Sequence, residues 1–232
     1  MRKAVNILFI ILTGFFLVAP AGTGNVVTVK TLEIRGLKYM TKAELIQGVR
    51  MKAMERGLAV DLDSLHGVLA GSRFIRAYTV RESGDSLVVS IEEKEPVRLL
   101  VVKKGDQRVA MELDESGTII SVNRVHRPLS PAIVIGETDI VKGTVTAAVK
   151  ELFGLLDEVR AACPVLYGQM ELVDAEGLNS IGVRLRGRKT LYRLSPDLAQ
   201  FTRLQYLVGY LDRKGAGPAS VVLSGDKALV RQ

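Results

Sequence analysis

An uncharged apolar run near the N-terminus constrains this chain more than any other feature. The run Ala4–Ala21 contains no charged residue, and Arg2 and Lys3 precede it. At 1.5 Å per residue, about 18 to 20 residues just span a hydrocarbon core of about 30 Å. Because the positive charges lie on its N-terminal side, we expect the C-terminal portion to lie outside the cytoplasm. Residues 1–25 are therefore predicted to be a short cytoplasmic tail and a single inner-membrane anchor.

A cleaved signal peptide is the alternative for the same segment. Ala19-Pro20-Ala21 has the small-x-small pattern of a signal-peptidase site, after which the mature chain would start at Gly22. Both interpretations export the rest of the chain. Cys163 is the single cysteine, so the chain has no cysteine pair for an internal disulfide.

The charge of the chain is basic, with 32 Lys and Arg against 25 Asp and Glu. From Arg160 to the C-terminus the counts are eleven basic and six acidic residues, scattered rather than grouped. Nucleic-acid recognition is one interpretation, but aromatic residues make up only 5% of the chain and no block of Lys and Arg occurs. A solvated basic face near anionic lipid headgroups is the interpretation that the pattern favours.

The first exported unit shows an alternation of strand and helix signals. Thr41 and Glu44 have the spacing of a capping box, which predicts the start of a helix. The expected elements are a strand that ends at Gly36, a helix from Thr41 to Gly57, a second helix that begins at Asp61, and the hairpin strands Ile75–Glu82 and Leu87–Glu92. This order predicts a compact α+β unit in which two helices cover a three-stranded sheet.

From Leu99 onward the pattern changes to short strands separated by glycine turns. Apolar residues recur every three or four positions between Gly143 and Ala162, which predicts an amphipathic helix. Ser195-Pro196 is typical of the start of a second helix. A hairpin is expected at the C-terminus, with strands at Val221–Leu223 and Ala228–Val230. The fold class is therefore α+β, with a mixed β-domain that contains two helices.

Candidate catalytic residues are few. His66 and His126 lie in different predicted elements, and nothing in their spacing brings them together. Glu92 and Glu93 should point to opposite faces of a strand, which disfavours paired-carboxylate chemistry. We therefore expect no catalytic site, no metal site and no cofactor site, and an envelope hydrolase is the least favoured function.

Several stretches in order along the chain resemble the FtsQ/DivIB family of bacterial cell-division proteins. They are Val29–Gly36, Phe74–Val80, Leu87–Val97, Leu113–Ile119 and Pro131–Gly136. The stretch Leu87–Val97 carries the strongest likeness, because its Glu93-Lys94-Glu95-Pro96-Val97 resembles the junction between two domains in that family. The chain departs from the family at Arg73-Phe74 and at Val221–Ser224.

The resemblance implies both an architecture and a function. Residues 26–98 would form a POTRA domain and residues 99–232 an FtsQ-type β-domain in the periplasmic or extracytoplasmic space. Proteins of this family are non-enzymatic scaffolds at the division septum. They bind the FtsB/FtsL coiled-coil pair and help recruit other septal membrane proteins. An exported POTRA-type chaperone or assembly factor for envelope proteins is the alternative.

The predicted partner-binding site is the last hairpin, whose final strand should have one free edge. The site residues are Ser224, Gly225, Asp226, Lys227, Ala228, Leu229, Val230 and Arg231. A strand without proline or an inward-pointing charge can accept a partner strand along its edge. Proline at Leu229 is then expected to interrupt strand addition. The alternative is a strand that merely closes the sheet.

Overall fold

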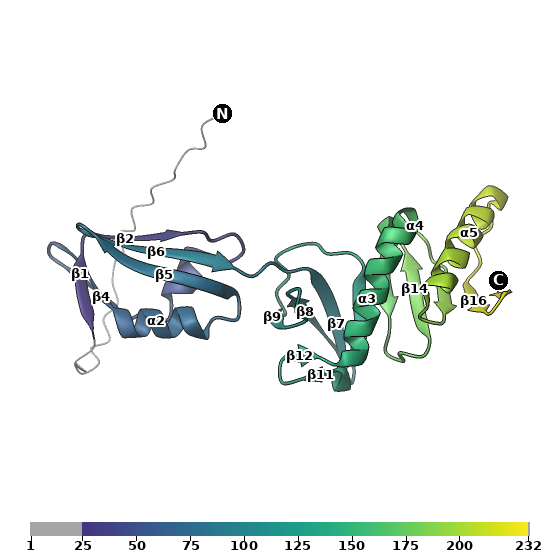
Figure 1. The fold of residues 1–232 in the computed structure, drawn as a ribbon, viewed down its shortest axis with the longest axis horizontal. Helices are drawn as coiled ribbons and strands as arrows, with labels where there is room; N and C mark the ends of the chain where they lie inside the picture. Colours follow the sequence, from purple (N-terminus) through teal and green to yellow (C-terminus); the bar gives the residue numbers. More distant parts are fainter. Residues whose placement is uncertain (1–24, 232) are drawn as a thin grey trace, which may run out of the picture. The chain divides into compact units, whose positions relative to one another are not determined.

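The computed structural model describes residues 25–231, which form two compact units that meet between Glu93 and Lys94 (Figure 1). The boundary that the sequence predicts lies after residue 98. The protein is of mixed α+β class, as the sequence predicts. The predicted anchor and the alternative signal peptide lie outside the described residues. Within residues 25–231, no helix has the length and apolar character needed to cross a membrane.

The first unit, residues 25–93, contains two small sheets and two helices. One sheet has the order β2-β6-β5, with β2 (Thr31–Arg35) parallel to β6 (Ser86–Glu93) and β5 (Ile75–Ser83) antiparallel to β6. The other sheet has the order β1-β4-β3, formed by β1 (Val26–Val29), β4 (Gly57–Asp61) and β3 (Met51–Met54). The helices are α1 (Lys42–Ile46) and α2 (Leu62–Gly71). The predicted three-stranded sheet is therefore present, and a second sheet accompanies it.

The predicted start of α1 is confirmed. The Thr41 hydroxyl accepts a hydrogen bond from the Glu44 amide at 3.2 Å, and the Glu44 carboxylate accepts one from the Thr41 amide at 2.8 Å. These contacts satisfy amides that have no partner in the first turn of a helix.

The predicted length of this helix is wrong. The helix ends at Ile46, and the segment that was expected to continue it forms the hairpin β3–β4. Met51–Met54 consists of residues that favour a helix locally. However, β1 pairs with β4 over four residues, and this non-local pairing draws the segment into a sheet.

Gly36 ends β2 in a conformation that only glycine adopts easily. Its φ is +88°, and a Cβ atom there would lie 1.9 Å from the Ile91 carbonyl oxygen. The close approach of these two backbones explains why a glycine stands at this strand end.

The second unit, residues 94–231, is built on one mixed sheet of nine strands. Its strand order is β17-β16-β15-β14-β13-β10-β7-β8-β9. The strands are β7 (Arg98–Lys104), β8 (Gln107–Leu113), β9 (Ile119–Val122), β10 (Ala132–Gly136), β13 (Met170–Asp174), β14 (Ile181–Leu185), β15 (Leu191–Leu194), β16 (Ser220–Ser224) and β17 (Lys227–Arg231). A two-stranded sheet of β11 (Ile140–Val141) and β12 (Thr144–Val145) follows the short 3-10 helix Glu137–Asp139.

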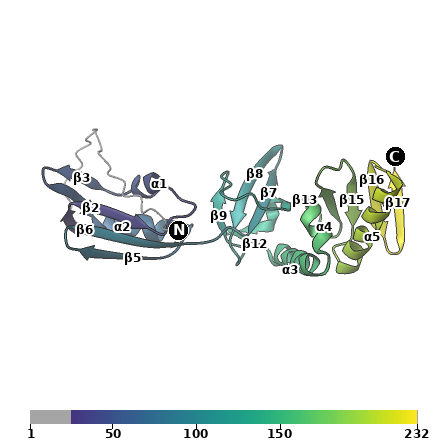
Figure 2. The same ribbon diagram turned by 90° about the horizontal axis from the view of Figure 1, so that it is seen from above.

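Helices cover one face of this sheet. They are α3 (Ala147–Ala162), α4 (Pro164–Gln169) and α5 (Leu198–Lys214), and Figures 1 and 2 show them against the strands. The predicted amphipathic helices are both present, although α3 begins after Gly143 because Thr144–Val145 belongs to β12. One core joins the helices to the sheet and includes Leu100, Ile133, Val183, Tyr192 and Val221.

The opposite face of the sheet carries the residues that alternate with this core. Leu99, Leu172, Leu191 and Val222 are half-buried and lie outside the core cluster. Directly paired residues share a face of a sheet, so the strand registers assign each side chain to the helix-covered face or to this open face.

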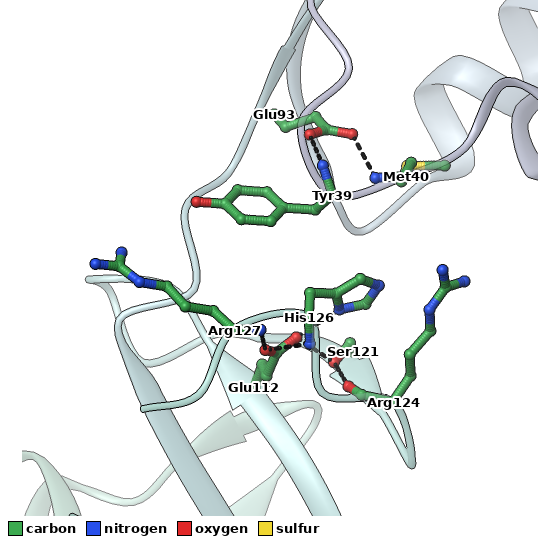
Figure 3. A network of polar contacts seen from close by, with 8 residues as sticks. All are labelled: Tyr39, Met40, Glu93, Glu112, Ser121, Arg124, His126 and Arg127. Atoms are coloured by element: carbon green, nitrogen blue, oxygen red, sulfur yellow. Dashed lines mark hydrogen bonds and ion pairs between the residues drawn. The ribbon is translucent and has the colours of Figure 1, made fainter. Parts of the chain in front are cut away.

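A loop fastened by Glu112 covers the open face at its β8 end. The Glu112 carboxylate is fully buried and accepts hydrogen bonds from the amides of His126 and Arg127 at 2.7 and 3.0 Å (Figure 3). It also contacts the His126 Nδ1 atom at 2.6 Å and accepts a hydrogen bond from the Ser121 hydroxyl at 2.9 Å. Burial raises the pKa of Glu112, but these hydrogen bonds outweigh burial and hold the pKa below its usual value.

Each unit has its own core of buried apolar residues within residues 25–231. The core of the first unit runs from Val29 to Ile91, and the core of the second from Leu100 to Leu223. A chain that starts at Asn25 therefore keeps all of these core residues.

Candidate partner-binding edge

The candidate site lies at the last strand of the nine-stranded sheet. β17 pairs with β16 along one edge, and no strand within residues 25–231 pairs with its other edge. The strand at the opposite end of the sheet, β9, is less open, because the Ile119 amide donates to the Gly143 carbonyl and Thr118 bridges Thr144. β17 is therefore the more accessible of the two end strands.

The turn that leads into β17 is held by α5. Gly225 has a φ of +54°, which suits the two-residue turn of a hairpin. Arg203 donates to the Gly225 carbonyl at 2.5 Å and forms an ion pair with Asp226 at 2.5 Å. Gln200 donates to the same carbonyl at 3.2 Å. These contacts fix the position of the hairpin although its side chains are exposed.

The hairpin register determines which backbone groups face the free edge. Ser224 and Lys227 close a two-residue turn, so they form a hydrogen-bonded pair, and the pairing alternates from there. Leu229, opposite Val222, therefore bonds to β16, whereas Ala228 and Val230 direct their amides and carbonyls to the free edge. The expectation that proline at Leu229 would remove an edge donor is accordingly wrong. Ala228 and Val230 hold the groups that a partner strand would use.

The side chains of β17 are exposed along its whole length. Leu229 is 56% and Val230 46% exposed, which is unusual for aliphatic residues in a strand. Leu229 lies on the open face with Val222, and Val230 lies on the helix-covered face with Val221. A strand added here would thus meet apolar side chains on both faces. All eight residues of the predicted site lie together on this hairpin.

One flank of α5 extends the site, and sequence reasoning missed it. Arg203, Tyr206 and Tyr210 follow helical spacing along this flank. Tyr206 is 73% exposed and Tyr210 is 51% exposed. Arg203 of the same flank contacts the hairpin turn, and the two tyrosines follow it along α5, about one and two helical turns away. The amphipathic pattern predicts exposure of these tyrosines, but only the Arg203 contact relates them to β17.

The groups considered for catalysis are dispersed. The His66 Nδ1 atom lies 3.2 Å from the Tyr78 hydroxyl in the first unit, and His126 contacts buried Glu112 in the second. Cys163 is buried, with its sulfur 3.8 Å from the Thr202 hydroxyl. Within the described residues, no group of three or more His, Cys, Asp or Glu could hold a metal ion.

The glutamates at the junction of the two units also have structural contacts. Glu93 accepts hydrogen bonds from the amides of Lys38, Tyr39 and Met40 at 2.6, 2.7 and 3.0 Å, two of which Figure 3 draws. Glu92 pairs with Arg76 at 3.5 Å. Three backbone donors on one carboxylate fasten the Lys38–Met40 turn to the end of β6.

A cavity of about 410 Å³ lies beside α3 in the second unit. Arg98 contacts Asp157 at 2.5 Å there and lies over the Phe153 ring at 5.4 Å. Burial raises the pKa of Asp114 at the rim, but hydrogen bonds from Ser116 and Thr118 outweigh burial and lower the pKa. Arg160 also pairs with Asp157, and Asp114 pairs with Lys94, which is the pattern of a structural network.

Comparisons with known proteins give no family assignment. No protein-family model matches the chain, and no curated protein matches it.

Proposed function

We propose that this protein is a non-enzymatic scaffold of the bacterial division machinery, which binds an FtsB/FtsL-like pair by addition of a partner strand to β17. The free edge of β17 is the observation that carries the proposal. Backbone groups of Ala228 and Val230 face that edge, and exposed Leu229 and Val230 flank it. Strand addition takes affinity from the backbone and specificity from alternate side chains. The ordered likeness to the FtsQ/DivIB family supports the choice of partner.

Co-purification tests this proposal. The chain is produced with the FtsB/FtsL-like pair from the same bacterium, and capture is compared between the intact chain and Val230→Pro. Capture that falls in the variant while its circular dichroism is unchanged supports the proposal. Undiminished capture by a folded Val230→Pro protein rejects the β17 edge.

The first unit offers the alternative site. Its β5 edge, Ile75–Ser83, is a long end strand with mostly exposed residues, and an exported assembly factor would use such an edge. Glu82, opposite Leu87, directs its amide to the free edge of β5, so Glu82→Pro with Glu82→Ala as its control tests that edge. Loss of partner capture in Glu82→Pro alone would move the site to the first unit.

The proposed location is the inner membrane, with the described residues on its outer side. The sequence of Ala4–Ala21 supports this location. N-terminal sequencing of the protein from isolated membranes tests it. A mature chain that starts at Gly22 would exclude the anchor and leave export intact.

A further inference from the structure

The strands at the C-terminal end of the sheet carry basic residues without acidic ones. The four strands β14 to β17 contain Arg184, Arg193, Lys227 and Arg231 and no Asp or Glu. All four basic residues are exposed. None of them has an ion-pair partner within the part of the chain that the structure describes.

The strand registers place all four basic side chains on the open face. Arg184 pairs with Leu191, Leu191 with Ser220, and Ser220 with Arg231, so these residues form one row across four strands. Arg193 lies in the next row, opposite Val222.

Lys227 lies opposite Ser224, two residues beyond Val222 on β16, and so shares the same face. With strands about 4.8 Å apart, Arg184 and Arg231 are about 14 Å apart. The four cations are thus spread over two dimensions of the open face of the sheet, and this surface is named the basic face.

The acidic residues of this region are engaged elsewhere. After Arg160, Asp212 pairs with Arg188 and Asp226 with Arg203, both on the helix side. Asp197 caps α5 by accepting from the Gln200 amide.

Asp174 also lies on the open face, in the row of Arg193 with Gly182 between them, but it pairs with Lys103 of β7, as does Glu176. Glu171, in the β13 bulge, is the remaining acidic residue and forms no ion pair with the basic face. Four basic residues that form no ion pair within residues 25–231 therefore gather on this face, whereas Arg213 and Lys214 lie on α5.

Apolar side chains lie between the cations. Leu191, Val222 and Leu229 occupy the same face in the rows of the arginines, and Leu229 is 56% exposed. The one aromatic residue of these strands, Tyr192, is buried on the helix-covered face. The basic face thus lacks the aromatic platforms that bind single-stranded nucleic acid by stacking.

We infer that the basic face binds the anionic headgroups of a phospholipid membrane. Cations spread in two dimensions with short aliphatic side chains between them match the array of headgroups on a charged bilayer, whereas an extended acidic peptide would need cations along one line. The predicted N-terminal anchor would hold the chain at a bilayer, so that a second, weak contact becomes effective. This inference goes beyond the proposed scaffold function. The basic face shares Lys227, Leu229 and Arg231 with the proposed partner site, but its Arg184 and Arg193 lie on β14 and β15, away from the free edge.

Vesicle sedimentation with the chain from Asn25 to Gln232 tests the inference. The probes are phosphatidylcholine vesicles with and without phosphatidylglycerol. We expect binding only to the vesicles that contain phosphatidylglycerol, with a loss of binding at high salt. Each basic residue near an anionic surface contributes to the free energy of binding. The double variant Arg184→Gln with Arg193→Gln loses two such contributions, so its binding to the vesicles should be weaker by about 30-fold.

A matched variant controls for net charge. The double variant Lys150→Gln with Arg213→Gln also removes two positive charges, but from exposed positions on α3 and α5. Its binding to the vesicles should stay near that of wild type. Circular dichroism verifies that all variants are folded. An equal loss in both double variants, or equal binding to phosphatidylcholine alone, would overturn the inference.

Two further arms identify the ligand. If soluble glycerol phosphate abolishes vesicle binding, the ligand is a small phosphoester rather than a membrane surface. If the chain binds polyglutamate but not vesicles, the ligand is an acidic protein. Either result overturns the inference. Arg184 and Arg193 lie on β14 and β15, away from the free edge of β17. Co-purification of the partner should therefore persist in Arg184→Gln with Arg193→Gln, which separates this inference from the proposed function.

Discussion

Proline at Val230 removes a backbone donor from the free edge of β17 without touching the bonded edge. The Val230 amide faces away from β16, so the β16–β17 ladder loses no hydrogen bond. A partner strand would lose one hydrogen bond, with a net value of about 0.5–1.5 kcal/mol, and the proline ring would displace the adjacent backbone. We expect a total loss of about 1–3 kcal/mol, which weakens partner binding by about 5- to 150-fold.

Two matched substitutions isolate the backbone contribution. Val230→Ala keeps the amide and trims a side chain that is already 46% exposed, so we expect a cost of about 1 kcal/mol or less. Leu229→Pro removes an amide that bonds to β16, so it should loosen the hairpin and lower the melting temperature. Val230→Pro should instead melt near the wild-type temperature.

The assay is titration of the captured partner against each folded variant, with thermal melting measured in parallel. If Val230→Pro and Val230→Ala weaken binding equally, side-chain packing rather than strand addition carries the affinity. If Val230→Pro lowers the melting temperature as much as Leu229→Pro, the register-based assignment of the free edge is wrong.

Three further predictions concern stability and chemistry. Hydrogen bonds hold the folded-state pKa of Glu112 below its usual value of 4.5, so its stabilisation is present above about pH 4.5 and is lost as pH falls through the folded-state pKa. Glu112→Gln should reduce this acid-induced drop in melting temperature. Gly36→Ala should destabilise the protein by about 3 kcal/mol or more in urea unfolding, whereas Gly67→Ala, a helical position with open space, should stabilise it by about 1 kcal/mol. His66→Ala with Cys163→Ala should leave partner capture near wild type, and a loss of capture by the folded double variant would reopen the question of a chemical role.

Local sequence signals predicted the elements whose stability is local. The capping box at Thr41, the glycine turns and the apolar spacing of Ala147–Ala162 each depend on contacts within a few residues. The terminal hairpin was predicted for the same reason, because its turn residues suffice to specify it. The candidate edge therefore followed from the sequence.

Long-range pairing decided what the sequence left open. The segment Met51–Met54 favours a helix by composition, but pairing of β4 with β1 makes it a strand. Glu112 sits in a strand of alternating residues and gives no sequence sign of full burial, because the loop that supplies its donors arrives from residues 121–127. Secondary-structure propensity reflects interactions within one helical turn or one strand. It could not predict these contacts, because they join segments that are distant in the sequence.

The sequence by itself determined that the chain is basic after Arg160 and that its last residues form a hairpin. The tertiary structure alone decided that Arg184, Arg193 and Arg231 share one open face, and that Val230 rather than Leu229 presents its amide to the free edge. The physical reason is register. A shift of one residue in strand pairing moves every side chain to the other face of the sheet. It also exchanges the amides that bond to the neighbouring strand with those that face the free edge. Register is fixed by the packing of the whole sheet.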